Sequence, residues 1–445
     1  VYQKSIDGMF NSQAQDTLWL NADSTFSLTL PGNGYEQIRL FLWGKRYLGS
    51  FIAEGGKYRL QIDAAAAKSV SILEGKNEKN MEVSELMDEL GKDVFDVLSR
   101  QGDKWNITRD TVASSVSRKL QDQVLALDEK MQGVDKDLYE KARQNARMQV
   151  MWAFQNQLFG IANRHSEATR QSWLKEWEKM MEFCQVNHPA STFSPAFHEV
   201  VYNNAGITYY IKGEPIDEDL KKNPYKLIFH YIEKNLTGQA QETAMALLFL
   251  MDANEEKYDP EILPLEERFR QMHPQSKWQP LIDKAIAKNK AFNQAEIPDY
   301  IHFPNVDKAK TLKEVTDLYK GKVIFMDIWA TWCGPCRESF AHVKPLQEYA
   351  KKNDIVLLYL SIDRPDDDAK WRKMAAHYDL MGEHVRAQEA FKKEIYDTFG
   401  NERGALSIPR CVIIGKDGKV KFTWAASPEN MEELASQLAE ASKEE

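Results

Sequence analysis

The sequence predicts a multidomain protein with a small antiparallel β domain at residues 1–76, an all-α domain at residues 77–294 and an α/β domain at residues 295–445. Two changes of pattern predict this order. Short runs of β-branched and aromatic residues give way to apolar residues at helical spacing. Near the carboxyl end, two apolar strand-like runs then enclose a helical segment, which is typical of a parallel β-α-β unit.

The composition restricts the classes of function. The chain has 58 basic and 67 acidic residues and a net charge of −9, with no long basic run or basic stripe, so nucleic acid is not expected as a partner. No apolar run reaches the roughly 18 residues of a membrane span. The chain begins at Val1 rather than at Met, which favours a mature envelope protein whose export signal has been removed.

The first domain is predicted from short strand-like runs separated by turn sequences rich in Gly, Asn and Asp. Apolar and polar residues alternate in several of them, as from Tyr58 to Ile62, which indicates one buried face and one exposed face. A small antiparallel sandwich or open barrel is therefore expected. Its predicted strands are Thr17–Leu20, Thr25–Leu30, Ile38–Trp43 and Tyr58–Ile62.

The middle domain is predicted to be helical because apolar residues recur every three or four positions, as in Leu120, Val124 and Leu127. Ser194-Pro195 and Asp259-Pro260 read as helix starts. The domain is rich in aromatic residues, which we expect to form its core rather than a ligand pocket, because burial is their commonest role. These aromatic residues include Trp152, Trp173, Trp177, Phe183, Tyr202, Tyr209 and Tyr210.

The last domain is predicted from a regular order of elements. Thr311 to Glu314 forms a capping box for a short helix, and the helix after Arg337 joins two buried parallel strands. Further helices are expected around Trp371–Tyr378 and Phe391–Phe399. A hairpin turns at Asp417-Gly418, and Ser427-Pro428 opens the last helix. The predicted strands are Val323–Ile328, Ile355–Ser361, Arg410–Ile414 and Lys419–Trp424.

Two cysteines separated by Gly334 and Pro335 lie where the strand Val323–Ile328 leads into a helix. Unpaired N–H groups and the macrodipole at a helix start stabilise an anion, so Cys333 is predicted to ionise and attack as a thiolate. Cys336, one turn further on, is predicted to be the resolving thiol. Three other roles for the cysteine pair are less favoured. A zinc site would need a second ligand pair, and a c-type haem would need His in place of Arg337. A purely structural disulfide would add little stability, because it closes so short a loop.

The stretch WATWCGPCR, with Asp327 two residues before Trp329, resembles thioredoxin-fold domains, and more closely the TlpA/ResA-type thiol-disulfide oxidoreductases of bacterial envelopes. This resemblance covers about the last third of the chain. The stretch from Phe51 to Gly56, followed by an alternating strand, is similar to the β-rich module that precedes thioredoxin domains in TlpA-like proteins of Bacteroidetes. It implies no activity for that module.

The resemblance implies further site residues. Pro409 stands where such folds hold a cis-proline facing the cysteine pair, which would leave the backbone of Ile408 free to pair with a substrate peptide; a trans turn proline is the alternative. Burial on an apolar strand should raise the pKa of Asp327, which could take the proton of Cys336; an ordinary strand residue with a hydrogen-bond partner is the alternative.

Two positions depart from the TlpA/ResA pattern. Ser339 and Ala341 stand where many relatives have Glu and Pro, so the acid role falls on Asp327 or water, and the active-site helix is expected to lack its usual kink. Trp329 and Trp332 are expected to cover the disulfide, and Trp332, Gly334, Pro335 and Ile408 to contact substrate.

The remaining cysteines, Cys184 and Cys411, are expected to be small buried side chains, although a bridge between them stays open. Four of the nine histidines, His188, His198, His230 and His273 of the middle domain, have no metal-like spacing. No metal or other cofactor is therefore expected.

The predicted function is reduction of protein disulfides in the cell envelope by the Cys333/Cys336 dithiol. It requires protein substrates with disulfides or thiols and an upstream electron donor. The alternatives are a disulfide oxidase or isomerase, and a partner-binding protein in which the thioredoxin domain is regulatory.

Overall fold

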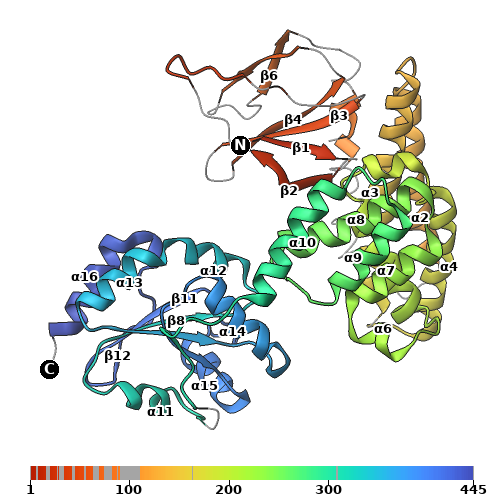
Figure 1. Ribbon diagram of the computed structural model, residues 1–445. Coiled ribbons are helices and arrows are strands. Elements are labelled where there is room, and N and C mark those ends of the chain that lie inside the picture. The colour runs from red at the N-terminus through yellow and green to blue at the C-terminus, as the bar shows by residue number, and fades with distance from the viewer. Residues whose placement is uncertain are drawn as a thin grey trace. The chain divides into compact units, whose positions relative to one another are not determined.

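The protein is known from a computed structural model, which describes residues 2–6, 9–16, 21–27, 29, 35–42, 46–54, 57–63, 70–74, 83–87, 89–90, 111–162, 164–306 and 309–443. The chain divides into two compact units, Val1–Lys288 and Asn289–Glu445 (Figure 1). The predicted separation of the first unit into a β-rich and an α-helical domain stays a prediction.

The first unit begins with antiparallel β structure. A four-stranded sheet has the order β2-β1-β3-β4, and β5 and β6 form a separate pair. Leu40 and Ala53 form a small core against which Tyr58, Leu60 and Ile62 pack. This contact confirms the predicted alternation of apolar and polar residues from Tyr58 to Ile62. The strands are β1 (Tyr2–Ile6), β2 (Met9–Asp16), β3 (Tyr35–Leu42), β4 (Arg46–Glu54), β5 (Arg59–Ile62) and β6 (Val70–Glu74).

The strand predicted to begin at Thr25 is wrong over the residues that the structure describes, 25–27 and 29, which lie outside any strand. The N–H and hydroxyl of Thr25 both donate to Asp23 Oδ1, at 3.0 and 2.6 Å, and the Asn21 N–H donates to Thr25 O at 2.7 Å. These bonds close a turn in place of a strand ladder. The predicted strand Thr17–Leu20 lies outside the described residues, and the sequence did not predict β1, β2, β4 or β6.

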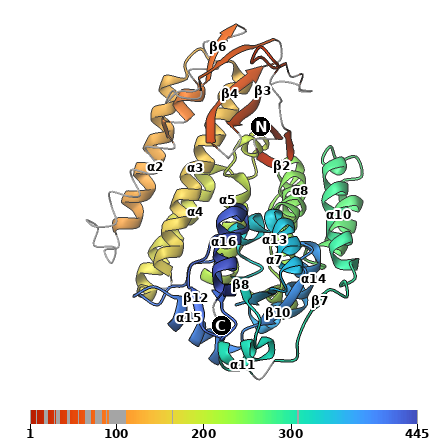
Figure 2. The same cartoon turned by 90° about the vertical axis from the view of Figure 1, so that its left-hand side faces the viewer.

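The described residues in the rest of the first unit are mainly helical, as predicted, and the last helix, α10, continues past Lys288. The long helices α2, α3 and α4 lie side by side (Figure 2). The helices are α2 (Thr111–Lys130), α3 (Lys136–Ala162), α4 (Glu167–Cys184), α5 (Phe197–Gly206), α6 (Glu218–Lys222), α7 (Pro224–Asn235), α8 (Gly238–Asn254), α9 (Ile262–Met272) and α10 (Gln279–Gln294), with a 3-10 turn η1 (Pro189–Phe193) and a π turn η2 (Ile207–Ile211). In the described part of the chain, no helix combines the length and apolar character needed to cross a bilayer.

The aromatic residues of this unit are largely core, as predicted, with two exceptions. Trp173, Trp177 and Tyr209 are buried, whereas Trp152 and Tyr210 are 39% and 61% exposed. Trp152 is exposed because it points away from the side of α3 that buries its neighbours in the sequence.

The second unit contains a six-stranded sheet with the order β12-β11-β8-β9-β10-β7. Strands β8, β9, β10 and β7 are parallel, whereas β11 runs antiparallel to β8 and β12 antiparallel to β11. The strands are β7 (Ile301–His302), β8 (Ile324–Trp329), β9 (Val356–Ser361), β10 (Gly382–Arg386), β11 (Arg410–Ile414) and β12 (Val420–Phe422). The sequence predicted four of them and did not predict β7 or β10.

Helices cover both faces of this sheet. Helices α12, α13 and α16 lie on one side, and α11 and α15 lie on the other (Figure 1). Right-handed crossovers require this division. The chain crosses the sheet in one direction from β7 to β8, through α11, and in the opposite direction from β8 to β9, through α12 and α13, so the two connections lie on opposite faces. The architecture is the thioredoxin fold that the resemblance implied. The helices are α11 (Leu312–Thr316), α12 (Gly334–Ser339), α13 (Val343–Lys352), α14 (Asp368–His377), α15 (Glu389–Phe399) and α16 (Met431–Lys443).

The start of β10 gives a test of the sheet. Gly382 has φ +141°, and a Cβ there would lie 2.5 Å from the carbonyl oxygen of Leu357 on the neighbouring strand. We expect Gly382→Ala to lower the free energy of unfolding by about 2 kcal/mol or more, since backbone conformation and steric overlap both oppose it. The matched control is Gly404→Ala, which has φ +72° but open space around its Cβ position. Urea denaturation of both variants checks the order; equal losses would contradict the close strand contact.

Candidate active site

The cysteine motif follows strand β8 directly, so it lies at the edge of the sheet where the carboxyl ends of the parallel strands meet. All six of its residues are buried, since β9 and β11 flank it and helices cover both faces. After Trp329 the chain turns sharply, and the Cys333 N–H donates to the Ala330 carbonyl at 3.0 Å. Cys333 therefore follows a tight turn at the carboxyl end of a central parallel strand, where α/β folds place their functional groups.

The two cysteines form a disulfide, Cys333–Cys336, with their Cα atoms 5.3 Å apart. Cys333 keeps 4% of its surface exposed, whereas Cys336 is completely buried. This difference has the order that the sequence predicted for an attacking and a resolving sulfur.

Cys333 is also the N-cap residue of α12. Its Sγ accepts a hydrogen bond from the Cys336 N–H at 3.1 Å, and its carbonyl accepts one from the Arg337 N–H at 3.2 Å. Pro335 lies in the first turn, where its missing N–H leaves no helical bond unmade. The helix start thus directs an N–H group toward the sulfur that would carry negative charge after reduction.

The expectation that the active-site helix lacks a kink is wrong. Helix α12 ends at Ser339, a 3-10 turn follows at Phe340–His342, and α13 begins at Val343. Pro345 accounts for the break, because it has no N–H to donate to the carbonyl of Ala341 and its ring crowds that carbonyl. The proline thus lies four residues after Ala341, the position at which the TlpA/ResA pattern has it.

The peptide bond between Ile408 and Pro409 is cis, as predicted. It immediately precedes β11, whose first residue, Arg410, pairs with Ile328 near the end of β8. Pro409 therefore lies at the same edge of the sheet as the cysteine turn. Both Ile408 and Pro409 are half-buried.

Asp327 lies within β8 and is 1% exposed. Its Oδ1 has no hydrogen-bond partner among the described residues, and burial raises the pKa of its carboxyl to about 7. Its neighbours across the sheet are Cys411 on β11 and Tyr359 on β9. The predicted shift is confirmed in direction, and an acid with this pKa can exchange a proton near neutral pH.

The aromatic residues near the motif occupy different environments. Trp329 is fully buried and packs edge-on against Phe340, with ring centroids 5.1 Å apart, whereas Trp332 is 62% exposed. Trp424, which was not predicted as a site residue, is 63% exposed, and the Arg410 guanidinium lies 3.6 Å from its ring centroid. Trp332 and Trp424 are thus large apolar surfaces beside the cysteine turn and the cis-proline respectively.

The other cysteines, Cys184 and Cys411, are free and buried, as expected for small core side chains. Burial raises the pKa of both thiols, which keeps them protonated and unreactive. Over the described ranges, no three His, Cys, Asp or Glu side chains come together in a way that could hold a metal ion.

Asp363 was not predicted as a site residue; it follows β9 and binds the turn before Cys333 through Thr331. The available signal was its position, because a polar residue directly after a buried parallel strand lies at the functional edge of the sheet.

The fold, the Cys333–Cys336 disulfide and the neighbouring cis-proline place the second unit among thioredoxin-like domains. Comparison with known families agrees: residues 289–438 match the Redoxin family, and the C-terminal region is a Redoxin domain.

Individual relatives resemble this same region. The chain is 29% identical over 127 residues to the thiol-disulfide oxidoreductase ResA of Bacillus thuringiensis subsp. konkukian, a match that covers 28% of the chain and 65% of that relative. It is 25% identical over 137 residues to the thiol:disulfide interchange protein CycY of Rhizobium leguminosarum, covering 29% of the chain and 68% of that relative. The chain thus spans slightly less than two thirds of the length of this ResA.

A solved structure is also similar. The solution structure of a candidate thiol-disulfide oxidoreductase from Bacteroides vulgatus shares 31% identity, covers 26% of the chain and 72% of its own length, and has a TM-score of 0.22.

The buried carboxyl of Asp327 should make stability depend on pH. Its folded pKa of about 7 lies above its ordinary value of 3.8, so ionisation destabilises the fold progressively as pH rises from about 4 to 7. We expect Asp327→Asn to remove this dependence, so that the variant gains about 2 kcal/mol relative to the natural protein between about pH 5 and pH 8. Urea denaturation at both pH values checks it; parallel pH profiles for the two proteins would contradict the raised pKa.

Proposed function

We propose that the protein is a thiol-disulfide oxidoreductase that reduces protein disulfides through the Cys333/Cys336 pair. The observation that carries this proposal is the disulfide itself, placed at the strand-to-helix turn with Cys333 slightly exposed and Cys336 buried. A disulfide that only stabilised the fold would close a longer loop than the three-residue separation found here.

In the proposed reaction the reduced protein attacks first through Cys333. Its thiolate forms a bond to one sulfur of the substrate disulfide, and the other substrate sulfur leaves as a thiolate that takes a proton from water. The N–H of Cys336, which donates to Cys333 Sγ in the oxidised structure, stabilises that sulfur as an anion before the attack.

Cys336 then resolves the mixed disulfide. Its sulfur attacks Cys333 Sγ, the second substrate sulfur leaves, and the two electrons of the dithiol have passed to the substrate. The attack needs the Cys336 thiolate, and we assign the proton acceptor to Asp327, whose raised pKa suits a base near neutral pH. An upstream electron donor must afterwards reduce the Cys333–Cys336 disulfide.

The substrate is proposed to lie over the exposed rim of the site. Trp332 and Pro335 are exposed and Gly334 is partly exposed, so all three can contact a polypeptide that approaches Cys333. In the described part of the chain, no residue donates to or accepts from the backbone of Ile408, which leaves it available to pair with an extended segment of substrate.

The reducing direction is supported by the Gly-Pro pair between the cysteines, which resembles the thioredoxin motif. A location in the cell envelope is supported by the resemblance to TlpA/ResA-type proteins, and fractionation of cells that express the natural gene would test it. A disulfide oxidase or isomerase would use the same site, so the redox potential distinguishes these functions.

The trapping experiment tests the roles of the two sulfurs. We expect Cys336→Ser to accumulate mixed disulfides with envelope proteins through Cys333, because the resolving thiol is absent. The matched control is Cys333→Ser, which should trap none. Non-reducing electrophoresis followed by mass spectrometry checks both variants. Trapping by Cys333→Ser rather than by Cys336→Ser would contradict the assignment, and trapping by neither would favour a partner-binding role.

Equilibration with glutathione tests the direction. We expect a potential near that of thioredoxin, about −270 mV, rather than the roughly −120 mV of a strong oxidant such as DsbA. The fraction of reduced protein at several glutathione ratios checks this value. A potential near about −120 mV would contradict the proposed reductase function and favour a disulfide oxidase.

A further inference from the structure

We propose that Asp363 is a positioning residue of the redox centre, which holds the turn before Cys333 so that Sγ stays within reach of the Cys336 N–H. The inference rests on the proposed function for its biological meaning, but its test does not require a protein substrate. Asp363 lies two residues beyond the end of β9 and is completely buried.

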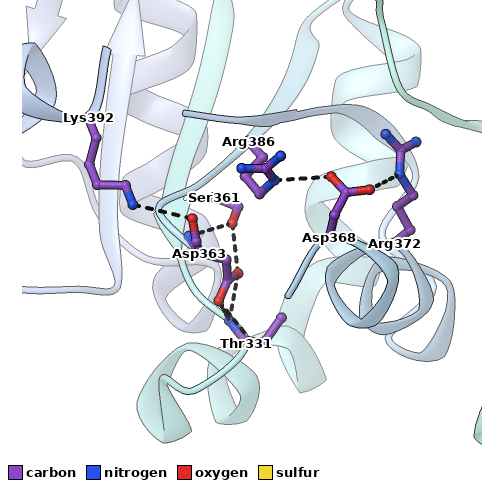
Figure 3. Close-up of polar contacts among 7 residues, drawn as sticks. All are labelled: Thr331, Ser361, Asp363, Asp368, Arg372, Arg386 and Lys392. Carbon is purple, nitrogen blue, oxygen red and sulfur yellow. Dashed lines mark hydrogen bonds and ion pairs between the residues drawn. The ribbon is translucent and has the colours of Figure 1, made fainter. Parts of the chain in front are cut away.

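The Asp363 carboxylate binds Thr331 through both backbone and side chain (Figure 3). The Thr331 N–H donates to Oδ1 and Oδ2 at 3.1 and 3.0 Å, and the Thr331 hydroxyl donates to Oδ1 at 2.8 Å. Hydrogen bonds to an ionised carboxylate are stronger than those between neutral groups. The Asp363 carboxylate, just beyond the end of β9, therefore fixes the position of the Thr331 peptide.

Other groups fix Asp363 in turn. The Ser361 hydroxyl donates to Oδ2 at 2.7 Å and accepts from the Asp363 N–H at 3.0 Å. Lys392 of α15 donates to the Asp363 carbonyl at 3.3 Å. Burial raises the pKa of Asp363, while the hydrogen bonds from Ser361 and Thr331 oppose that rise. The carboxylate is thus held by donors on both oxygens.

The link from Thr331 to the reactive sulfur is short. Thr331 lies inside the turn that the Cys333 N–H closes on Ala330 at 3.0 Å, and Cys333 Sγ accepts from the Cys336 N–H at 3.1 Å. If the Thr331 peptide moves, the turn and the sulfur move with it. Loss of the bond to the Cys336 N–H would remove a donor that favours the thiolate, and the pKa of Cys333 would rise.

An alternative role for Asp363 predicts the opposite sign. A carboxylate that acted only through its negative charge would disfavour the nearby thiolate, so removing that charge would lower the pKa of Cys333. Positioning predicts that loss of the charge and loss of the Thr331 hydroxyl both raise it. The two roles are therefore distinguishable by direction.

The experiment measures the rate of iodoacetamide alkylation of Cys333 as a function of pH, in full-length reduced protein that carries Cys336→Ser. We expect Asp363→Asn and Thr331→Val each to raise the apparent pKa and to slow alkylation at pH 7 by about threefold to tenfold, the range expected from loss of a hydrogen bond. Thr331→Ser keeps the hydroxyl and should restore the rate. Cys184 and Cys411 are buried and should not react.

The matched control is Asp366→Asn, which removes an exposed carboxylate three residues from Asp363 and should leave the pH profile unchanged. Faster alkylation in Asp363→Asn, or an unchanged profile in Thr331→Val, would overturn the positioning role. If Asp363→Asn fails to fold, the comparison of Thr331→Val with Thr331→Ser still decides. A protein that shows these profiles yet reduces no protein disulfide would overturn the proposed function and leave this inference intact.

Discussion

The pairing of β8 with β9 on one side and β11 on the other is the constraint on which the site depends. Three segments far apart in the sequence end at one edge of the sheet because of it: the cysteine turn after Trp329, Asp363 after β9, and the cis-proline before β11. The pairs Trp329 with Ser361 and Ile328 with Arg410 define that edge. A change of register in either pairing would separate the groups that the chemistry needs together.

Two buried aspartates near the disulfide illustrate how surroundings decide the behaviour of the same side chain. Asp327 lies in the middle of β8, has no partner for Oδ1 among the residues that the structure describes, and has a pKa of about 7, so it is suited to exchange a proton. Asp363 lies at the strand end, where Thr331 and Ser361 donate to both of its oxygens. A carboxylate surrounded by donors is suited to hold backbone in place rather than to act as a base.

The sequence predicted the second unit more fully than the first, and local patterns explain why. A buried parallel strand followed by Cys-Gly-Pro-Cys and an amphipathic helix is specified by neighbouring residues, as is the Asp-Gly hairpin. Strands β7 and β10 were missed because β7 has two residues and the burial of β10 depends on distant partners. The break before α13 was not predicted because Ala341 stands where the TlpA/ResA pattern has its proline, whereas Pro345 acts on the carbonyl of Ala341, four residues before it. The Asp363 bonds to Thr331 join positions 32 apart and leave no local pattern.

The break between α12 and α13 has a mechanical consequence. Helix α13 is anchored by Val343, Leu346 and Ala350, which are buried, whereas the six-residue helix α12 begins directly after Cys333 and contains Cys336. If α12 and α13 were one continuous helix, a displacement of the sulfur atoms would also shift the residues of α13 that pack in the core. With a joint at Phe340–His342, we expect the short cysteine segment to relax when the covalent link opens, while the anchored segment keeps its place against the sheet.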